Sequence, residues 1–368
     1  MGKQSKLDQG VKCYLKYGAL ISPLGTTIEE HADALLSNKS GIKQVDGSGF
    51  NNENWFLGKM NQLSGDYDGL LEKALDSLES TWDKDILKSP RTGVFVSTTK
   101  ANMKLLPGDT FESTRSLIKK HLCQTQDPII ISNACISGVV AVNVAADYVK
   151  AGKFDRAIII GIDVLSDFII YGFQSLFALG NEVCKPFDAE RKGISLGEAC
   201  GIVLMTNKCE EGVFAEYIAG ASSNDANHIS GPSRTGEGLV RAVTKTLERA
   251  EMDKTEIDFV SAHGTATIYN DEMEAIAFNR LGLEQTPLNS LKGYFGHTLG
   301  AAGIIELLSC MISMEKNTLI KSLGYQQCGT TQTLAIIDEN REKELTTILK
   351  TASGFGGGNA SLILKKVQ

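Results

Sequence analysis

Short apolar runs alternate with segments of helical apolar spacing along almost the whole chain. Runs rich in β-branched residues predict strands, and apolar residues three or four positions apart predict helices. Residues 41–68 are rich in Gly, Asn, Asp and Ser, so we predict a loop layer there, with Trp55 and Phe56 as anchors. In this first part we predict strands at 14–20, 91–97, 128–131 and 156–162, and helices from a cap at Thr26 or Thr27 to Leu36 and at 70–78, 112–121 and 139–149.

A similar order of elements begins again after residue 213. The predicted elements are a segment from 218, helices at 238–250, 272–281 and 301–314, and strands at 257–262, 347–352 and 361–365. Strands that alternate with helices in both parts predict an α/β protein whose sheets are buried between helix layers. We therefore expect two pseudo-duplicated βαβ halves, residues 1–210 and 211–368. The repeat is visible in element order rather than in residue identity.

The composition is that of a globular protein with an ample core, with 42% hydrophobic residues, 22% charged residues and a formal net charge of -7. No apolar run is long enough to cross a bilayer. The acidic balance argues against nucleic acid as a partner. The eight cysteines contain no Cys-x-x-Cys pair, which argues against a zinc site and a disulfide framework. We expect a cytoplasmic protein with reduced thiols, no bound metal and no membrane partner.

One cysteine lies on a predicted strand-to-helix turn. Cys135 follows the apolar strand at 128–131 and precedes the Ala/Val-rich helix at 139–149. The unpaired N–H groups and the positive dipole end of that helix favour thiolate, whereas a free cysteine is only about 3% ionised at neutral pH. We therefore consider Cys135 a candidate nucleophile. The alternative is that it is a small buried hydrophobe, as most free cysteines are.

Two of the five histidines stand beside glycines near predicted strand ends. His263 precedes Gly264, and His297 follows Gly296. A lone histidine in such a place is more often structural, but two of them together with the cysteine point to acid–base chemistry. For the other three histidines we predict no catalytic role; they are His31, His121 and His228.

These residues belong to a longer set of motifs that resembles the β-ketoacyl-[acyl carrier protein] synthases of the elongating type, which have the thiolase fold. The resemblance spans almost the whole chain from about residue 11. Its motifs are Ala134-Cys135-x-Ser137-Gly138, Pro186-Phe187-Asp188-x-x-Arg191-x-Gly193 with Gly197-Glu198, His263-Gly-Thr-x-Thr with Asp271 and Glu274, Lys292-x4-His297 with Glu306, and Gly354-Phe355-Gly356-Gly357-x-Asn359.

The resemblance implies a layered α-β-α-β-α sandwich and a decarboxylative Claisen condensation. Cys135 would carry the acyl group, His263 and His297 would assist loss of CO2 from a malonyl group, Lys292 would orient the histidines, and Glu306 would balance its charge. The backbone N–H groups of Cys135 and Phe355 would form an oxyanion hole, and Phe355 would also act as a gate. The implied substrate-binding residues are Thr265, Thr267, Phe173, Ile136, Gly354 and Gly356.

The resemblance also implies the partners. No cofactor would be bound, because the acyl carrier protein supplies the phosphopantetheine arm. The assembly would be a homodimer, with a heterodimer with a related subunit as a possibility. The product would enter fatty acid or specialised polyketide or aryl-polyene-type biosynthesis.

Two alternatives remain open at this stage. In one the chain is a non-elongating partner like a chain length factor, but such a subunit has no need of Cys135, His263, His297 and Lys292 together. In the other it is a degradative thiolase, which uses a late cysteine as a base. Cys328 is the one late cysteine, and it lies well before the Gly-rich motif.

Overall fold

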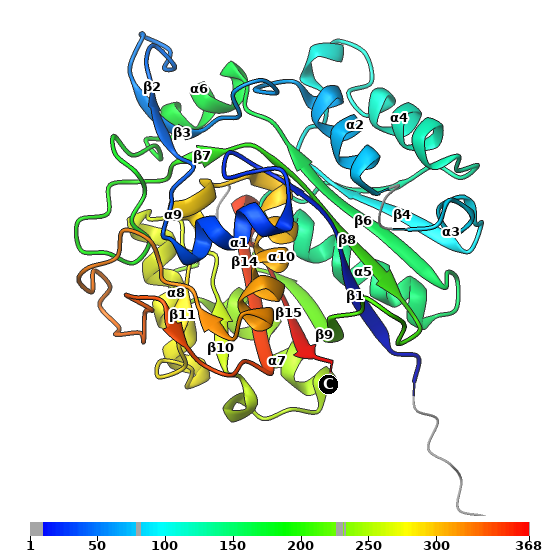
Figure 1. Cartoon of the computed structure of the whole chain (residues 1–368). Helices are drawn as coiled ribbons and strands as arrows, with labels where there is room; N and C mark the ends of the chain where they lie inside the picture. Colours follow the sequence, from blue (N-terminus) through cyan, green and yellow to red (C-terminus); the bar gives the residue numbers. More distant parts are fainter. Residues whose placement is uncertain (1–9, 79–81, 226–230, 232, 368) are drawn as a thin grey trace, which may run out of the picture.

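The computed structural model describes residues 10–78, 82–225, 231 and 233–367, so His228 lies outside the described residues. Figure 1 shows a main sheet with one layer of helices between its two parts and further helices on the outside of each part. This sheet consists, in spatial order, of β11 (Leu288–Asn289), β10 (Phe259–Ser261), β14 (Thr347–Gly354), β15 (Gly358–Lys366), β9 (Ala215–Asn224), β1 (Cys13–Ile21), β8 (Ala199–Thr206), β6 (Arg156–Asp163), β4 (Thr92–Ser97) and β5 (Ile129–Ile131).

The sheet is built from two blocks with the same strand directions. In the first block β1, β8 and β6 are antiparallel neighbours, and β6, β4 and β5 are parallel. In the second block β9, β15 and β14 are antiparallel, and β14, β10 and β11 are parallel. Three residue pairs between β1 and β9 join the blocks. The predicted fold class is confirmed, whereas the boundary of the halves at residue 210 stays a prediction.

The helices form three layers (Figure 1). The middle layer is α5 (Ser137–Lys150) and α10 (Ala302–Glu315), which contact each other and strands of both blocks. On the outside of the first block lie α2 (Tyr67–Leu78), α3 (Lys84–Lys88) and α4 (Glu112–Leu122), and on the outside of the second lie α7 (Glu237–Ala250) and α8 (Ile268–Leu281). This is the layered sandwich that the family resemblance implied. The helix α1 (Ile28–Leu36), capped by Thr27 as predicted, packs on α10 and β1.

The two middle helices approach each other closely at their first turns. A Cβ on Gly138 would lie 2.8 Å from the Cα of Gly303, and a Cβ on Gly303 would lie 2.5 Å from the backbone nitrogen of Val139. Only glycine allows this approach, because real Cβ contacts are not that short. The contact brings the segments that precede α5 and α10 side by side, and these segments carry Cys135 and His297.

The predicted loop layer at 41–68 is wrong in part. It contains β2 (Lys43–Val45) and β3 (Trp55–Gly58), which form a small sheet with β7 (Leu196–Gly197). The buried carboxylate of Glu198 holds the polar segment that follows, since it accepts hydrogen bonds from Met60 N at 2.8 Å and Gly65 N at 3.0 Å. Such a tertiary contact leaves no periodic signal in the sequence. The other elements are α6 (Asp167–Ser175), α9 (Lys292–Phe295), β12 (Thr318–Leu319), β13 (Arg341–Glu342) and the 3-10 turns η1 (Met103–Leu105), η2 (Lys254–Glu256), η3 (Leu299–Ala301) and η4 (Phe355–Gly357).

All eight cysteines carry free thiols. Within the part of the chain that the structure describes, none of the helices combines the length and the apolar character needed to span a membrane.

Candidate active site

Cys135 lies on a strained turn between β5 and α5. The preceding residue, Ala134, has a φ of 45°, a region that L-residues seldom occupy. The hydroxyl of Ser137 holds this turn, since it accepts a hydrogen bond from Asn133 N and donates one to Ala134 O, both at 2.7 Å. The turn places Cys135 beyond the end of the sheet and leaves the residue 7% exposed.

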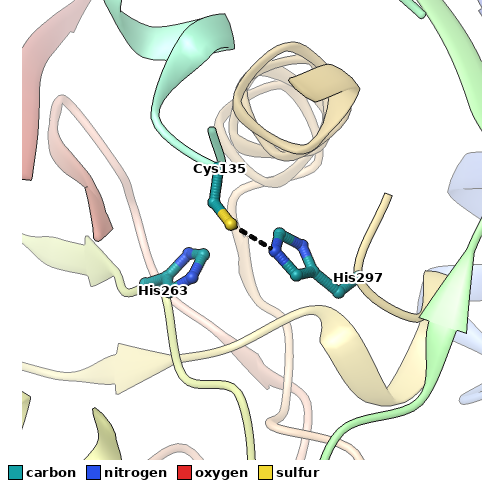
Figure 2. A group of neighbouring side chains, drawn as sticks. All are labelled: Cys135, His263 and His297. Atoms are coloured by element: carbon teal, nitrogen blue, oxygen red, sulfur yellow. Dashed lines mark hydrogen bonds between the residues drawn. The ribbon is translucent and has the colours of Figure 1, made fainter. Parts of the chain in front are cut away.

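Figure 2 shows the Cys135 thiol between the His263 and His297 rings. The Sγ atom of Cys135 lies 2.9 Å from Nε2 of His297. The centroids of the two imidazole rings are 5.2 Å apart, and the rings are nearly perpendicular. The structure therefore brings together the sulfur from the first part of the chain and both imidazoles from the second, as the sequence predicted.

Two buried carboxylates on α8 hold the loop that carries His263. Glu274 accepts hydrogen bonds from the backbone N–H groups of His263 at 2.8 Å and Gly264 at 2.6 Å. Asp271 accepts one from Thr265 N at 2.9 Å. Burial, together with the neighbouring Asp271, raises the pKa of Glu274 to about 7. The acidic residues behind the His263 motif thus fix the backbone of the loop rather than face the cavity.

Main-chain hydrogen bonds to β7 and to Ser195, the residue just before β7, hold the segment around His297. His297 N donates to Ser195 O at 2.7 Å, and His297 O accepts from Gly197 N at 3.0 Å. The left-handed φ of 72° at Gly296 lets the chain turn into this pairing. The imidazole is therefore placed by backbone geometry on both sides of the residue.

Behind the histidines lies a buried cluster of two lysines and one glutamate. Lys292 Nζ lies 2.7 Å from Glu306 Oε1, donates to His263 O at 2.6 Å and lies 3.3 Å from Nδ1 of His263. The predicted Lys292–Glu306 pair is therefore present. Lys350 Nζ also contacts this carboxylate, 2.8 Å from Oε2, and Lys350 is fully buried. Sequence reasoning missed Lys350, although a lysine inside a predicted apolar strand at 347–352 is a signal of a paired buried charge.

The ionisation of the cysteine differs from the expectation. Burial raises the pKa of the Cys135 thiol to about 11, and the nearby Lys292 ammonium and the backbone N–H groups of Phe355 and Cys135 oppose this only in part. Burial also lowers the pKa of His263 and of His297 well below the usual value, and Lys292 acts in the same direction. The resting pair at neutral pH is therefore a neutral thiol and a neutral imidazole. The predicted preference for thiolate is wrong for the resting site, because desolvation outweighs the helix dipole.

The three side chains line a cavity of about 510 Å³. Of the residues that the resemblance implied for substrate binding, the cavity lining includes Thr265, Thr267, Phe173 and Gly354. Ile136 is instead buried beneath the Gly-rich turn, where a Cβ on Gly358 would meet its side chain at 2.9 Å. Gly356 has a φ of 81° and also lies outside the lining.

Phe355 stands at the tip of the β14–β15 hairpin. Its ring stacks on that of Phe173 with the centroids 5.5 Å apart, and the residue is 37% exposed. A Cβ on the preceding Gly354 would lie 3.1 Å from Cys135 N, so the hairpin tip lies against the backbone of the turn that carries Cys135. The ring thus closes one side of the cavity near Cys135.

The same trio is the one group of three or more Cys, His, Asp or Glu among the described residues whose ligand atoms are close enough to hold a metal ion. These atoms lie within 4.8 Å of one another. A zinc ion shared by a sulfur and a nitrogen would separate them by about 3.5 Å. The 2.9 Å between Sγ and Nε2 is shorter and is that of a direct hydrogen bond.

The sequence around this site matches the models of a known protein family. Residues 127–211 match the N-terminal domain of the β-ketoacyl synthases, and residues 214–326 match their C-terminal domain. The chain belongs to the β-ketoacyl synthase family. Both matched regions include residues of the site described above, with Cys135 in the first and His263 in the second.

Relatives and solved structures of this family differ in how much of their length they share with the chain. The putative polyketide β-ketoacyl synthase 1 of Streptomyces halstedii is 32% identical over 65% of this chain, and the chain spans 61% of that relative. The putative mitochondrial 3-oxoacyl-[acyl-carrier-protein] synthase of Schizosaccharomyces pombe is 24% identical, over 94% of this chain and 97% of that relative. A chain of the complex of the ketosynthase ApeO with its chain length factor ApeC from Xenorhabdus doucetiae superposes with a TM-score of 0.84 at 25% identity, covering 100% of both chains.

Proposed function

We propose that this β-ketoacyl synthase family member condenses a Cys135-bound acyl group with malonyl-[acyl carrier protein] to give β-ketoacyl-[acyl carrier protein] and CO2. The observation that carries the proposal is the contact of Cys135 Sγ with His297 Nε2 at 2.9 Å, next to a second imidazole. A cavity of about 510 Å³ opens onto all three side chains. With Nε2 of His297 2.9 Å from Sγ, the neutral imidazole can accept the thiol proton as the sulfur attacks the acyl group.

In the first step the sulfur of Cys135 attacks the thioester carbonyl of the incoming acyl carrier. Nε2 of His297 takes the thiol proton, the bond from the acyl carbon to the carrier sulfur breaks, and the departing thiolate receives a proton. The backbone N–H groups of Cys135 and Phe355 lower the pKa of the thiol, which supports them as donors to the oxyanion that would form beside it. Loss of one such donor typically raises a barrier by about 2.7 to 4 kcal/mol.

In the second step the malonyl group loses its carboxylate. The carbon–carbon bond breaks, CO2 leaves, and the electron pair moves onto the malonyl thioester as an enolate. N–H groups of the two imidazoles suit the enolate oxygen, and the Lys292 ammonium, which contacts His263, adds positive charge behind them. The enolate carbon then attacks the acyl carbon, and the Cys135 sulfur leaves as a thiolate, which takes up one proton from water.

The partners follow from the same chemistry. An acyl carrier protein would deliver both thioesters, and the hydroxyls of Thr265 and Thr267, 2.8 Å apart on the cavity lining, would hydrogen-bond its phosphopantetheine amides. We propose a dimer, either of two copies or with a related subunit, in a fatty acid or specialised polyketide pathway. The related structure that contains a ketosynthase and its chain length factor supports the heterodimer as the second candidate.

The proposal is tested by acylation of the intact protein. With acyl-carrier protein, mass spectrometry should show one acyl group on wild-type Cys135, and Cys135→Ala should lower the condensation rate by at least about 10⁴-fold. Cys328→Ala is the matched control, because this thiol is exposed and lies outside the cavity. A Cys135→Ala variant that condenses at the wild-type rate would contradict the mechanism, whereas a wild-type protein that neither takes up an acyl group nor condenses would favour the non-elongating partner.

A further inference from the structure

Lys350 is a fully buried charge for which the reaction steps above have no use. It lies in the middle of β14, in the second block of the sheet, and its side chain points toward the end of β10. A buried lysine without a role is costly, because the ammonium loses its hydration. Its contacts therefore call for an explanation.

Four oxygen atoms surround the ammonium. Lys350 Nζ lies 3.2 Å from Ser261 O, 3.3 Å from Ala262 O, 2.5 Å from Thr351 O and 2.8 Å from Glu306 Oε2. An ammonium group has three protons to donate, so four oxygens exceed its donor count. A shell of main-chain carbonyls and one carboxylate is the environment of a monovalent cation rather than that of a directed hydrogen-bond donor.

The four oxygen atoms around Lys350 Nζ form a cage that is linked to His263 through the end of β10. Lys350 binds the carbonyls of residues 261 and 262, and Lys292 binds the next carbonyl, that of His263. Glu306 bridges the two ammonium groups. Three successive carbonyls at the end of β10 are thus fixed by two cations that share one carboxylate. His263 is the last of these three residues, so its side chain is attached directly to the fixed segment.

We propose that Lys350 is a positioning residue of the condensation site, and that its ammonium acts as a tethered monovalent cation which fixes the end of β10 and hence His263. The role rests on the proposed condensing function, whereas the oxygen cage itself does not. With two ammonium groups against one carboxylate, the cluster also keeps positive charge behind His263 and His297. Burial lowers the pKa of both histidines, and the charge of Lys292 and Lys350 acts in the same direction, which supports the neutral imidazoles used in the reaction.

The test removes the tether and offers a free cation. Lys350→Ala leaves the cage without its ammonium group, so a free cation can enter. The melting temperature of this variant should therefore rise when potassium or ammonium chloride replaces tetramethylammonium chloride at equal ionic strength. The reason is that a ligand which binds only the folded state stabilises it. Lys366→Ala is the matched control. Lys366 also donates to a carbonyl, Met314 O at 2.9 Å, but on β15 and away from the cavity. This control should show no preference for potassium or ammonium.

The kinetic arm uses Lys350→Met, which fills the space without charge or donors. Per Cys135 that accepts an acyl group, kcat for condensation should fall by about 100-fold with KM for malonyl-carrier unchanged, because a misplaced group costs roughly that much. In Lys350→Ala, potassium or ammonium should raise kcat at least about tenfold over its value in tetramethylammonium. Wild-type kcat in Lys350→Met, or a Lys350→Ala variant whose stability and rate ignore the cation, would overturn the proposal. A wild-type protein without condensing activity would refute the function, while the melting measurement would still decide on the cage.

Discussion

The two blocks of the sheet have the same strand directions but carry different polar chemistry at equivalent places. β4 and β10 hold the same position in their blocks, each between two parallel neighbours. Beyond β4, the hydroxyls of Thr98 and Thr99 donate to the buried Asp163 at 3.0 Å and 2.9 Å. Beyond β10, the hydroxyls of Thr265 and Thr267 pair with each other at the cavity lining.

The difference extends to the buried ion pairs. Asp163 of the first block is saturated by the two threonines, by Lys100 Nζ at 2.9 Å and by Gly300 N at 2.8 Å. In the second block Lys292, Glu306 and Lys350 form a cluster beside two imidazoles. In the first block these polar groups satisfy one another, and Cys135 is the residue that reaches the imidazoles. In the second block the charged cluster lies behind His263 and His297, so the sulfur and the two imidazoles come from different blocks of a repeated fold.

The strongest challenge to this division is removal of each imidazole. His263→Ala should slow decarboxylation of malonyl-carrier by about 10² to 10⁴-fold and slow acyl transfer to Cys135 much less, because His263 makes no hydrogen bond to the sulfur. His297→Ala should slow both steps, since Nε2 contacts Sγ at 2.9 Å. Release of labelled CO2 and burst acylation by mass spectrometry measure the two steps separately.

His121→Ala serves as the control for both variants, because this histidine lies outside the cavity. If His263→Ala lost acyl transfer as completely as decarboxylation, the two tasks would not be divided as described.

The pH dependence of stability sharpens the same comparison. The pKa of His263 and His297 is lowered, so the unfolded chain binds more protons than the folded one below pH 6.5. Their contribution is fully present above about pH 6.5 and is lost as the pH falls, at up to about 1.4 kcal/mol per pH unit and histidine. Urea unfolding at a series of pH values should show this slope in wild type and a smaller one in the double variant His263→Gln/His297→Gln.

Some acid sensitivity should persist in that double variant, because burial also lowers the pKa of His31 in the first block. An unchanged slope would mean that the two active-site imidazoles are not held neutral.

The sequence predicted the reactive trio because its members stand in local patterns. Cys135 lies between an apolar strand and a buried helix, and His263 and His297 stand beside glycines at element ends. What it could not show is which charges meet behind them. Lys350 is 44 residues from Glu306 and meets it only because α10 packs on β14 in the folded chain. The ionisation of Cys135 was mispredicted for a related reason, since helix position is local whereas burial depends on the whole fold.

The smallest effect concerns the two threonine pairs. Thr265→Ala should raise KM for carrier-bound substrates by about tenfold with kcat nearly unchanged, the loss expected for one hydrogen bond. Thr99→Ala removes a hydroxyl just beyond β4 in the first block, which donates to Asp163 rather than facing the cavity. It should lower the free energy of unfolding by about 1 to 3 kcal/mol and leave KM unchanged. Steady-state kinetics and urea unfolding of both variants are the required measurements. A Thr99→Ala variant with a raised KM would show that the first block also contacts substrate, and the functional contrast between the blocks would then not hold.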